Sequence, residues 1–143
     1  MAHNSEHESI SFLLGMIGKV QRSRVNEALA DVGLYAGQER VLIELSTQDS
    51  LTQSQLVESM CVQPPTVSKM LDRMEKNGLV ERHADAEDSR ITRVCLTEQG
   101  RTLNKDVCAV WGNLEARMIE GLSVEERIIL RRLLLQIYQN LTR

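Results

Sequence analysis

The chain has 143 residues, of which 42% are hydrophobic and 26% charged, and this balance is typical of a globular domain and excludes a disordered chain. No apolar run approaches the roughly 18 residues of a membrane span, and the polar N-terminus is unlike a signal peptide, so we expect a cytoplasmic protein with no membrane association. The formal net charge of −3 argues weakly against nucleic-acid binding, although a local basic stripe can coexist with an acidic remainder.

Helical periodicity dominates the first half of the chain. Apolar spacing and cap residues predict four helices, over residues 10–32, 37–46, 52–60 and 64–77. Thr52 and Gln55 have the spacing of a capping box, in which each side chain satisfies a free amide at a helix start. Pro64 and Pro65 suit the first positions of the fourth helix, because proline has no N–H to leave unsatisfied there. The polar segment 47–50 is expected only to break the helical pattern.

A hairpin and two more helices are predicted in the second half. Residues 79–83 and 91–96 are short alternating segments rich in β-branched side chains, and the polar loop between them is long enough to protrude into solvent. Helices are expected over 98–120 and, after a capping box at Ser123, up to Leu141. The last helix is apolar around most of its circumference, so it lies either at the centre of a monomer or against a partner chain, and we favour the partner.

The order helix, three-residue turn, helix and hairpin is that of a winged helix-turn-helix, whose second helix enters the major groove of DNA. On a helical wheel, the apolar face of this second helix consists of Val67, Met70, Leu71 and Met74. The exposed face is small and polar. Thr66 and Ser68 can bond phosphates or base edges, and Lys69 and Arg73 are long enough to reach either. The arrangement predicts a DNA-reading surface.

An ordinary solvated helix surface is the alternative interpretation of this polar face, and the hairpin that follows favours DNA binding. Its tip carries Arg90, which can enter a narrow minor groove where the negative potential is enhanced. Asp88 beside it can hold the loop in shape. Asp85 and Glu87 would be repelled by phosphate, so only part of the wing is expected to lie close to DNA.

Two sequence motifs are specific enough to indicate a family. Residues 65–82 read PTVSKMLDRMEKNGLVER, and the wing carries Asp88-Ser89-Arg90 followed by Leu96-Thr97 and Gly100. The stretch 51–100 closely resembles the MarR family of bacterial transcription regulators, and the flanking helices match that architecture over nearly the whole chain. The resemblance implies a mainly α fold with a small β-hairpin wing, a winged helix-turn-helix domain flanked by N- and C-terminal dimerisation helices. The implied regions of this one compact domain are 1–36 (N-terminal dimerisation helix), 37–100 (DNA-binding region) and 101–143 (C-terminal dimerisation helices).

The resemblance also implies a function. It implies a sequence-specific transcription regulator, commonly a repressor, that binds double-stranded DNA as a homodimer on a pseudo-palindromic operator and is released by a small lipophilic or phenolic effector. At matching positions, the DNA-binding residues that it implies are Gln63, Pro65, Thr66, Ser68, Lys69, Arg73, Asp88 and Arg90. The chain departs from the family pattern at Gln63, which is a poorer helix cap than Ser, Asp or Asn, and at Ala86 and Ser89, where the wing often has Pro and Arg.

Other interpretations compete with this one. An odd number of cysteines without CxxC spacing indicates buried free thiols, but Cys61 or Cys108 could serve a redox-sensing regulator. A metal site from His3, His7 and His83 lacks an acidic or thiol ligand at helical spacing, and no cofactor is expected. We expect no enzyme, because the sequence has neither a phosphate-binding loop nor a nucleophile elbow. A winged-helix module that binds other proteins stays open because the net charge is negative.

Overall fold

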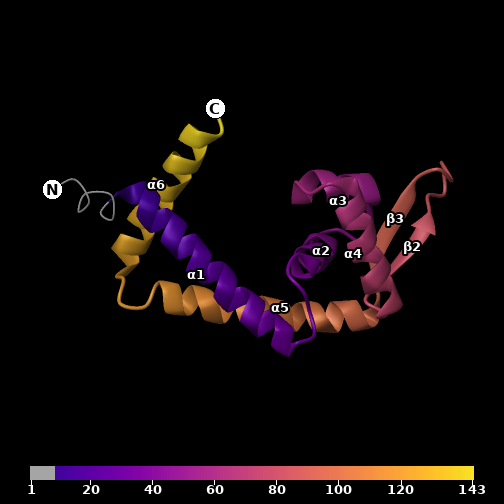
Figure 1. Cartoon of the computed structure of the whole chain (residues 1–143), viewed down its shortest axis with the longest axis horizontal. Coiled ribbons are helices and arrows are strands. Elements are labelled where there is room, and N and C mark those ends of the chain that lie inside the picture. Colours follow the sequence, from indigo (N-terminus) through magenta and orange to yellow (C-terminus); the bar gives the residue numbers. More distant parts are fainter. Residues whose placement is uncertain (1–8) are drawn as a thin grey trace. The chain divides into compact units, whose positions relative to one another are not determined.

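The computed structural model describes residues 9–143, so His3 and His7 of the metal hypothesis lie outside the described residues. Its helices are α1 (Ile10–Asp31), α2 (Gln38–Thr47), α3 (Gln53–Met60), α4 (Pro64–Lys76), α5 (Glu98–Met118) and α6 (Val124–Leu141) (Figure 1). Its strands are β1 (Leu51–Thr52), β2 (Val80–Ala84) and β3 (Thr92–Leu96). The chain forms two compact units, one ending at Trp111 and one covering Gly112–Arg143. The predicted fold class, a mainly helical winged helix-turn-helix, is confirmed.

Local capping signals set the helix starts. The capping box predicted at Thr52 is present in both directions, with the Gln55 amide donating to Thr52 Oγ1 at 3.1 Å and the Thr52 amide donating to Gln55 Oε1 at 2.8 Å. The box at Ser123 is present as well. By contrast, α4 starts at two prolines after Gln63, whose side chain makes no cap hydrogen bond. The prediction that Gln63 is a poor cap is therefore confirmed.

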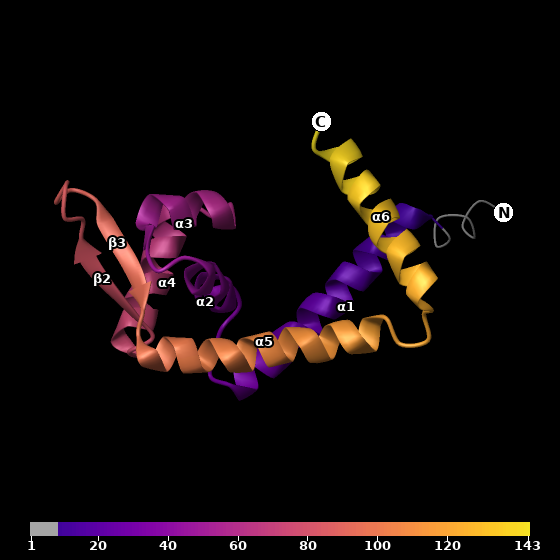
Figure 2. The ribbon, with the colours of Figure 1, turned by 180° about the vertical axis from the view of Figure 1, so that it is seen from behind.

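The sheet has three antiparallel strands in the order β1-β3-β2. β2 and β3 pair from Val80 opposite Leu96 to Ala84 opposite Thr92, and Figures 1 and 2 show them side by side with their connecting loop extending away from α2, α3 and α4. This is the predicted hairpin. Strand β1 was not predicted: the sequence gives only a broken helical pattern before Thr52, whereas Leu51 pairs with Val94 of β3.

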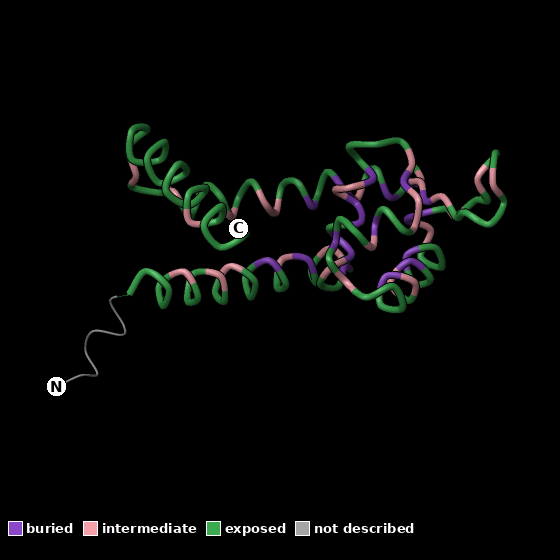
Figure 3. Tube along the Cα trace, turned by 90° about the horizontal axis from the view of Figure 1, so that it is seen from above, coloured by how far each residue is buried: buried purple, intermediate pink, exposed green. Residues whose placement is uncertain are grey.

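The core of the first unit lies where α2, α3 and α4 pack on the sheet and on the second half of α1 (Figure 3). Its fully buried side chains are Leu29, Val41, Leu42, Leu45, Leu56, Met60, Val67, Leu71, Met74, Val80, Val94 and Val107. Three of these belong to α4, so the apolar face of this helix is buried by other parts of the same chain. The opposite face is left to solvent.

A tight junction fixes the wing relative to α4. Thr97 Oγ1 donates to the carbonyl of Gly78, which follows α4, and accepts the Gly100 amide at 3.0 Å inside α5. A Cβ atom at position 100 would lie 2.1 Å from the carbonyl oxygen of Leu79, so only glycine fits this crossing. The hairpin and the start of α5 are thus held against the end of α4.

Two further expectations from the sequence have clear outcomes. The expected burial of the thiols is wrong for Cys61 and Cys108, which are exposed, and only partly met by Cys95. Cys61 follows the last residue of α3, where it caps the helix with a left-handed φ of 52°. In the second unit, α6 has no buried residue at all. No helix among the described residues combines the length and apolar character needed to cross a membrane.

Candidate nucleic-acid interface

Helix α4 presents a polar face opposite its buried one. Pro65, Thr66, Lys69 and Arg73 are exposed, and Ser68 is partly buried beside them. The sequence placed Met70 on the buried face, but it is only partly buried and lies at the border of the two faces. In the part of the chain that the structure describes, no ion pair engages Lys69 or Arg73. Their charges are therefore available to an external anion.

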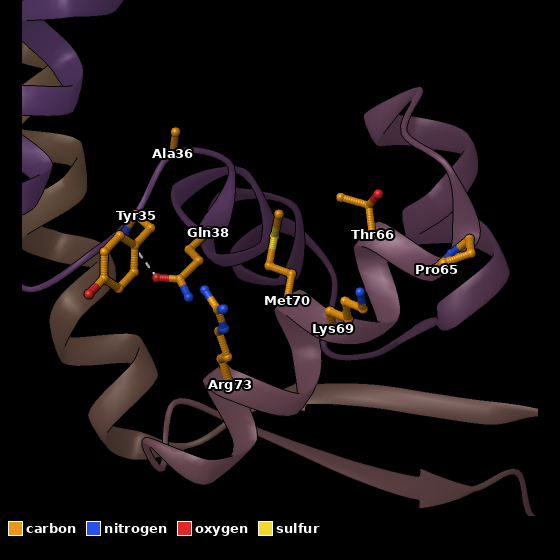
Figure 4. Close-up of a pocket in the computed structure, with 8 residues that line it drawn as sticks. All are labelled: Tyr35, Ala36, Gln38, Pro65, Thr66, Lys69, Met70 and Arg73. Atoms are coloured by element: carbon orange, nitrogen blue, oxygen red, sulfur yellow. Dashed lines mark hydrogen bonds between the residues drawn. The ribbon is translucent and has the colours of Figure 1, made fainter.

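The exposed residues of α4 form one wall of a hollow of about 270 Å³ (Figure 4). The residues that line it are Tyr35, Ala36, Gln38, Pro65, Thr66, Lys69, Met70 and Arg73. Four of the predicted DNA-binding residues thus share one surface, whereas Gln63 and Ser68 do not line it. The opposite wall comes from the segment between α1 and α2. This wall was not predicted from the sequence, because its residues lie some thirty positions away from α4 in the chain.

The start of α2 is fixed by hydrogen bonds of its own. The Tyr35 amide donates to Gln38 Oε1 at 3.0 Å, and the Gly37 amide donates to Glu39 Oε2 at 2.7 Å. Gly37 has a left-handed φ of 95°, and a Cβ atom there would lie 2.8 Å from the terminal methyl of Met70. The wall facing α4 is therefore rigid and closely packed against it.

At the wing tip, Asp88 and Arg90 lie together. The Arg90 guanidinium donates to both carboxylate oxygens of Asp88, at 3.0 and 2.9 Å, and the Arg90 amide donates to Oδ1 at 3.0 Å. These hydrogen bonds lower the pKa of Asp88 below its usual value. The Arg90 side chain is still 88% exposed, so the pair orients the guanidinium without burying it.

Asp85 has a larger part in shaping the loop than the sequence predicted. It forms an ion pair with Arg93 of β3, and its Oδ1 accepts the amides of Glu87 at 2.8 Å and Asp88 at 3.1 Å. Arg93, followed by these amides, lowers the pKa of Asp85 from 3.8 to about 2. The expected repulsion between Asp85 and phosphate is thus offset by a paired cation. An aspartate two or three residues before free amides is a turn signal that could have identified this role.

A second ion-pair cluster joins the wing to α4. The Arg82 guanidinium on β2 donates to Asp72 Oδ1 at 2.6 Å and to Glu75 Oε2 at 2.7 Å. These contacts lower the pKa of Glu75, chiefly through the hydrogen bond from Arg82, and raise that of Arg82. Asp72 lies on the exposed side of α4. The Arg82 guanidinium offsets one of the two carboxylate charges, which reduces the repulsion of an anion at α4.

A further hollow of about 370 Å³ lies between the wing and the starts of α3 and α4. Arg90 and Thr92 line it from the wing side, and Ser54 and Pro64 line it from the helices. The two hollows together place cations and hydroxyl groups of α3, α4 and the wing on surfaces of one unit.

A partly open cavity of about 450 Å³, which we call the inner cavity, lies between α1, the start of α2, the end of α3 and α4 within the first unit. Val25, Met60 and Trp111 contribute apolar surface, and Arg22 and Arg40 contribute positive charge. Arg40 donates to the carbonyls of Ser59 and Met60 at 3.1 and 3.3 Å, which holds the end of α3 at the cavity. The indole N–H of Trp111 is buried without a hydrogen-bond partner. Thr66 and Met70 line both this cavity and the hollow of about 270 Å³ beside α4, which we call the outer hollow.

Comparison with known proteins agrees with this geometry. The family model of the MarR family matches residues 34–92, which include α2, α3, α4, β2 and the wing loop, and it ends at the first residue of β3. The chain is 26% identical to S. aureus MepR in its DNA complex, with a TM-score of 0.82 and coverage of 92% of this chain and 98% of that one.

Two other solved structures are similar over most of their length. A MarR mutant from E. coli complexed with operator DNA is 26% identical, with a TM-score of 0.78 and coverage of 92% and 96% of the two chains. YusO from Bacillus subtilis is 25% identical, with a TM-score of 0.75 and coverage of 97% and 99%. The chain is thus similar to the MarR family in sequence over residues 34–92 and in fold over most of its length, and two of these similar structures are complexes with DNA.

Proposed function

We propose that the protein is a sequence-specific repressor that binds a pseudo-palindromic operator in the cytoplasm as a homodimer. The observation that carries this proposal is the exposed face of α4, where Pro65, Thr66, Lys69 and Arg73 share one hollow while the opposite face is buried. Two similar proteins, S. aureus MepR and an E. coli MarR mutant, have been solved with DNA. Their complexes support DNA binding by this chain.

In this proposal, the predicted residues divide into two groups. Those of α4 and its preceding turn face the major groove: Gln63, Pro65, Thr66, Ser68, Lys69 and Arg73. Arg90 reaches the adjacent minor groove, and Asp88 holds its guanidinium in place. Because Arg82 offsets one of the two negative charges of Asp72 and Glu75, these carboxylates oppose phosphate binding at α4 less than two free carboxylates would.

The homodimer is proposed to form through residues 1–36 and 101–143, with 37–100 as the DNA-binding region. Support comes from apolar side chains that the single chain leaves exposed. On α1 they are Ile10, Phe12, Leu13, Met16, Ile17 and Val20, and on α6 they are Val124, Ile128, Ile129, Leu130, Leu133, Leu134, Leu135, Tyr138 and Leu141. Patches of this kind mark association surfaces. A two-fold dimer would present two α4 helices about 34 Å apart, one helical turn of DNA.

The effector is proposed to be a small lipophilic or phenolic molecule that occupies the inner cavity. Apolar surface from Val25, Met60 and Trp111 suits an aromatic ring, and Arg22 and Arg40 suit an acidic substituent. Since Thr66 and Met70 belong to both the cavity and the DNA-facing hollow, an occupant acts directly on α4. A ligand that prefers a conformation unfavourable for DNA lowers DNA affinity by linkage.

The test is selection of duplexes from a random pool by the purified protein at near-physiological salt, followed by sequencing. We expect enrichment of an inverted repeat whose half-sites are about one helical turn apart. Retention that disappears at modest salt, with no enriched sequence, would contradict sequence-specific regulation. A variant with Lys69 and Arg73 both changed to alanine serves as the control, because it keeps the buried face of α4 intact.

A further inference from the structure

Tyr35 occupies the wall of the outer hollow that faces α4. It is one of two tyrosines in the chain and is 68% exposed. Its main chain is held on both sides, since its amide donates to Gln38 Oε1 at 3.0 Å and its carbonyl accepts the Gln38 amide at 3.1 Å. An aromatic side chain is therefore displayed to solvent from a fixed backbone. Core packing does not explain its position.

The position of Tyr35 along the hollow relates it to DNA. Figure 4 shows Tyr35 and Arg73 toward one end of the hollow and Pro65 at the other. Arg73 lies eight positions after Pro65 on α4, which corresponds to a rise of about 12 Å along the helix axis. This rise is close to the roughly 12 Å width of the major groove. When the start of such a helix contacts base edges, its second half reaches the edge of the groove, where the phosphates lie. Tyr35 then stands beside Arg73 at that edge.

We propose that Tyr35 is an additional DNA-positioning residue, whose hydroxyl donates a hydrogen bond to a phosphate next to the one that Arg73 neutralises. This inference rests on the proposed function of α4. A phenolic hydroxyl is a neutral donor, so the contact fixes the register of the protein on the duplex and carries no base information. The contact also displaces no counterion, so loss of the hydroxyl should not change the salt dependence of DNA affinity, whereas loss of Arg73 should.

The substitution Tyr35→Phe tests the contact, because it removes one hydroxyl and leaves the ring. Affinity for the selected operator and for a scrambled duplex is measured over a series of salt concentrations. We expect both affinities to fall by about 2- to 10-fold, with an unchanged salt slope. Arg73→Ala is expected to reduce the slope by about one. Ser46→Ala is the matched control, since it removes an exposed hydroxyl bonded to Ile43 at the other end of α2.

Phosphate-ethylation interference gives a readout that a structural role would not change. In each half-site, we expect one phosphate whose ethylation blocks binding of the wild type. Ethylation of the same phosphate should not affect binding of the Tyr35→Phe variant. Equal affinity of the variant and the wild type, or weaker binding with an unaltered interference pattern, would overturn the role of Tyr35 while leaving the proposed function intact. If the wild type binds no duplex, the proposed function fails and this inference fails with it.

Discussion

Helices α4 and α6 both carry many apolar side chains, but only α4 buries them within its own chain. Val67, Leu71 and Met74 of α4 are completely shielded from solvent, whereas every residue of α6 is at least partly exposed. A leucine-rich surface in water is unfavourable by roughly 25 cal/mol for each Å² that could be buried. The apolar face of α4 is thus buried within one chain, and we expect the apolar face of α6 to be buried by a second chain.

The polar faces differ as well. Around α4, acidic groups are engaged by neighbouring cations, as Asp72 and Glu75 are by Arg82, while Lys69 and Arg73 remain open to solvent. An overall charge of −3 therefore coexists with cations on α4 that are exposed and, among the described residues, unpaired, and this is the surface that we propose binds phosphate. Which charged side chains are paired and which are exposed matters more for binding than the net charge of the chain.

Leu134→Asp should produce the largest effect, because it places a charge in the surface that we assign to the partner chain. We expect monomers or aggregates in analytical ultracentrifugation, and loss of operator binding at concentrations where the wild type is a dimer. Leu71→Ala on α4 is the contrasting variant. It should lower the free energy of unfolding by about 2–5 kcal/mol at every protein concentration, as expected for a core cavity. A well-folded Leu134→Asp dimer would place the interface elsewhere.

Arg90→Ala should have an intermediate effect on DNA binding and little effect on folding, since the side chain is almost fully exposed. Loss of a charge-assisted contact predicts operator affinity lower by about tenfold or more and a salt slope smaller by about one. Fluorescence anisotropy with the selected operator measures both. Arg101→Ala provides a comparison, because Arg101, like Arg90, is an exposed arginine paired with a carboxylate, here that of Glu98. Equal losses in the two variants would remove the wing from the recognition mechanism.

The helices and their caps follow from local sequence, and they were predicted with small errors at the ends. Thr52 with Gln55 illustrates the reason, because both halves of the capping box lie within one turn. Strand β1 was missed because its two residues acquire their conformation from pairing with Val94 and Arg93, more than forty residues later. Features that depend on such distant partners leave no periodic trace in the sequence.

The candidate site also combines features that local sequence predicts with features that depend on distant contacts. The exposed face of α4 could be found on a helical wheel, since Val67 and Leu71 mark the buried side. The facing wall with Tyr35, and the neutralisation of Asp85 by Arg93, depend on how separate elements meet. Exposure of Cys61, which caps α3 with a left-handed φ, was not predicted either.

Asp85→Asn should have the smallest effect, and it concerns how the wing is held. Because folding lowers the pKa of Asp85 from 3.8 to about 2, its ionised form stabilises the loop fully above about pH 4, and this contribution is lost as the pH falls toward 2. Hydrogen exchange of the Glu87 and Asp88 amides should therefore be faster in the variant at pH 5, with the difference from wild type closing between pH 4 and 2. Solvent screening keeps the difference small. Arg93→Met should reproduce it, because it removes the cation that contributes most to the shift, whereas an unchanged pH dependence in both variants would mean that the backbone alone shapes the wing.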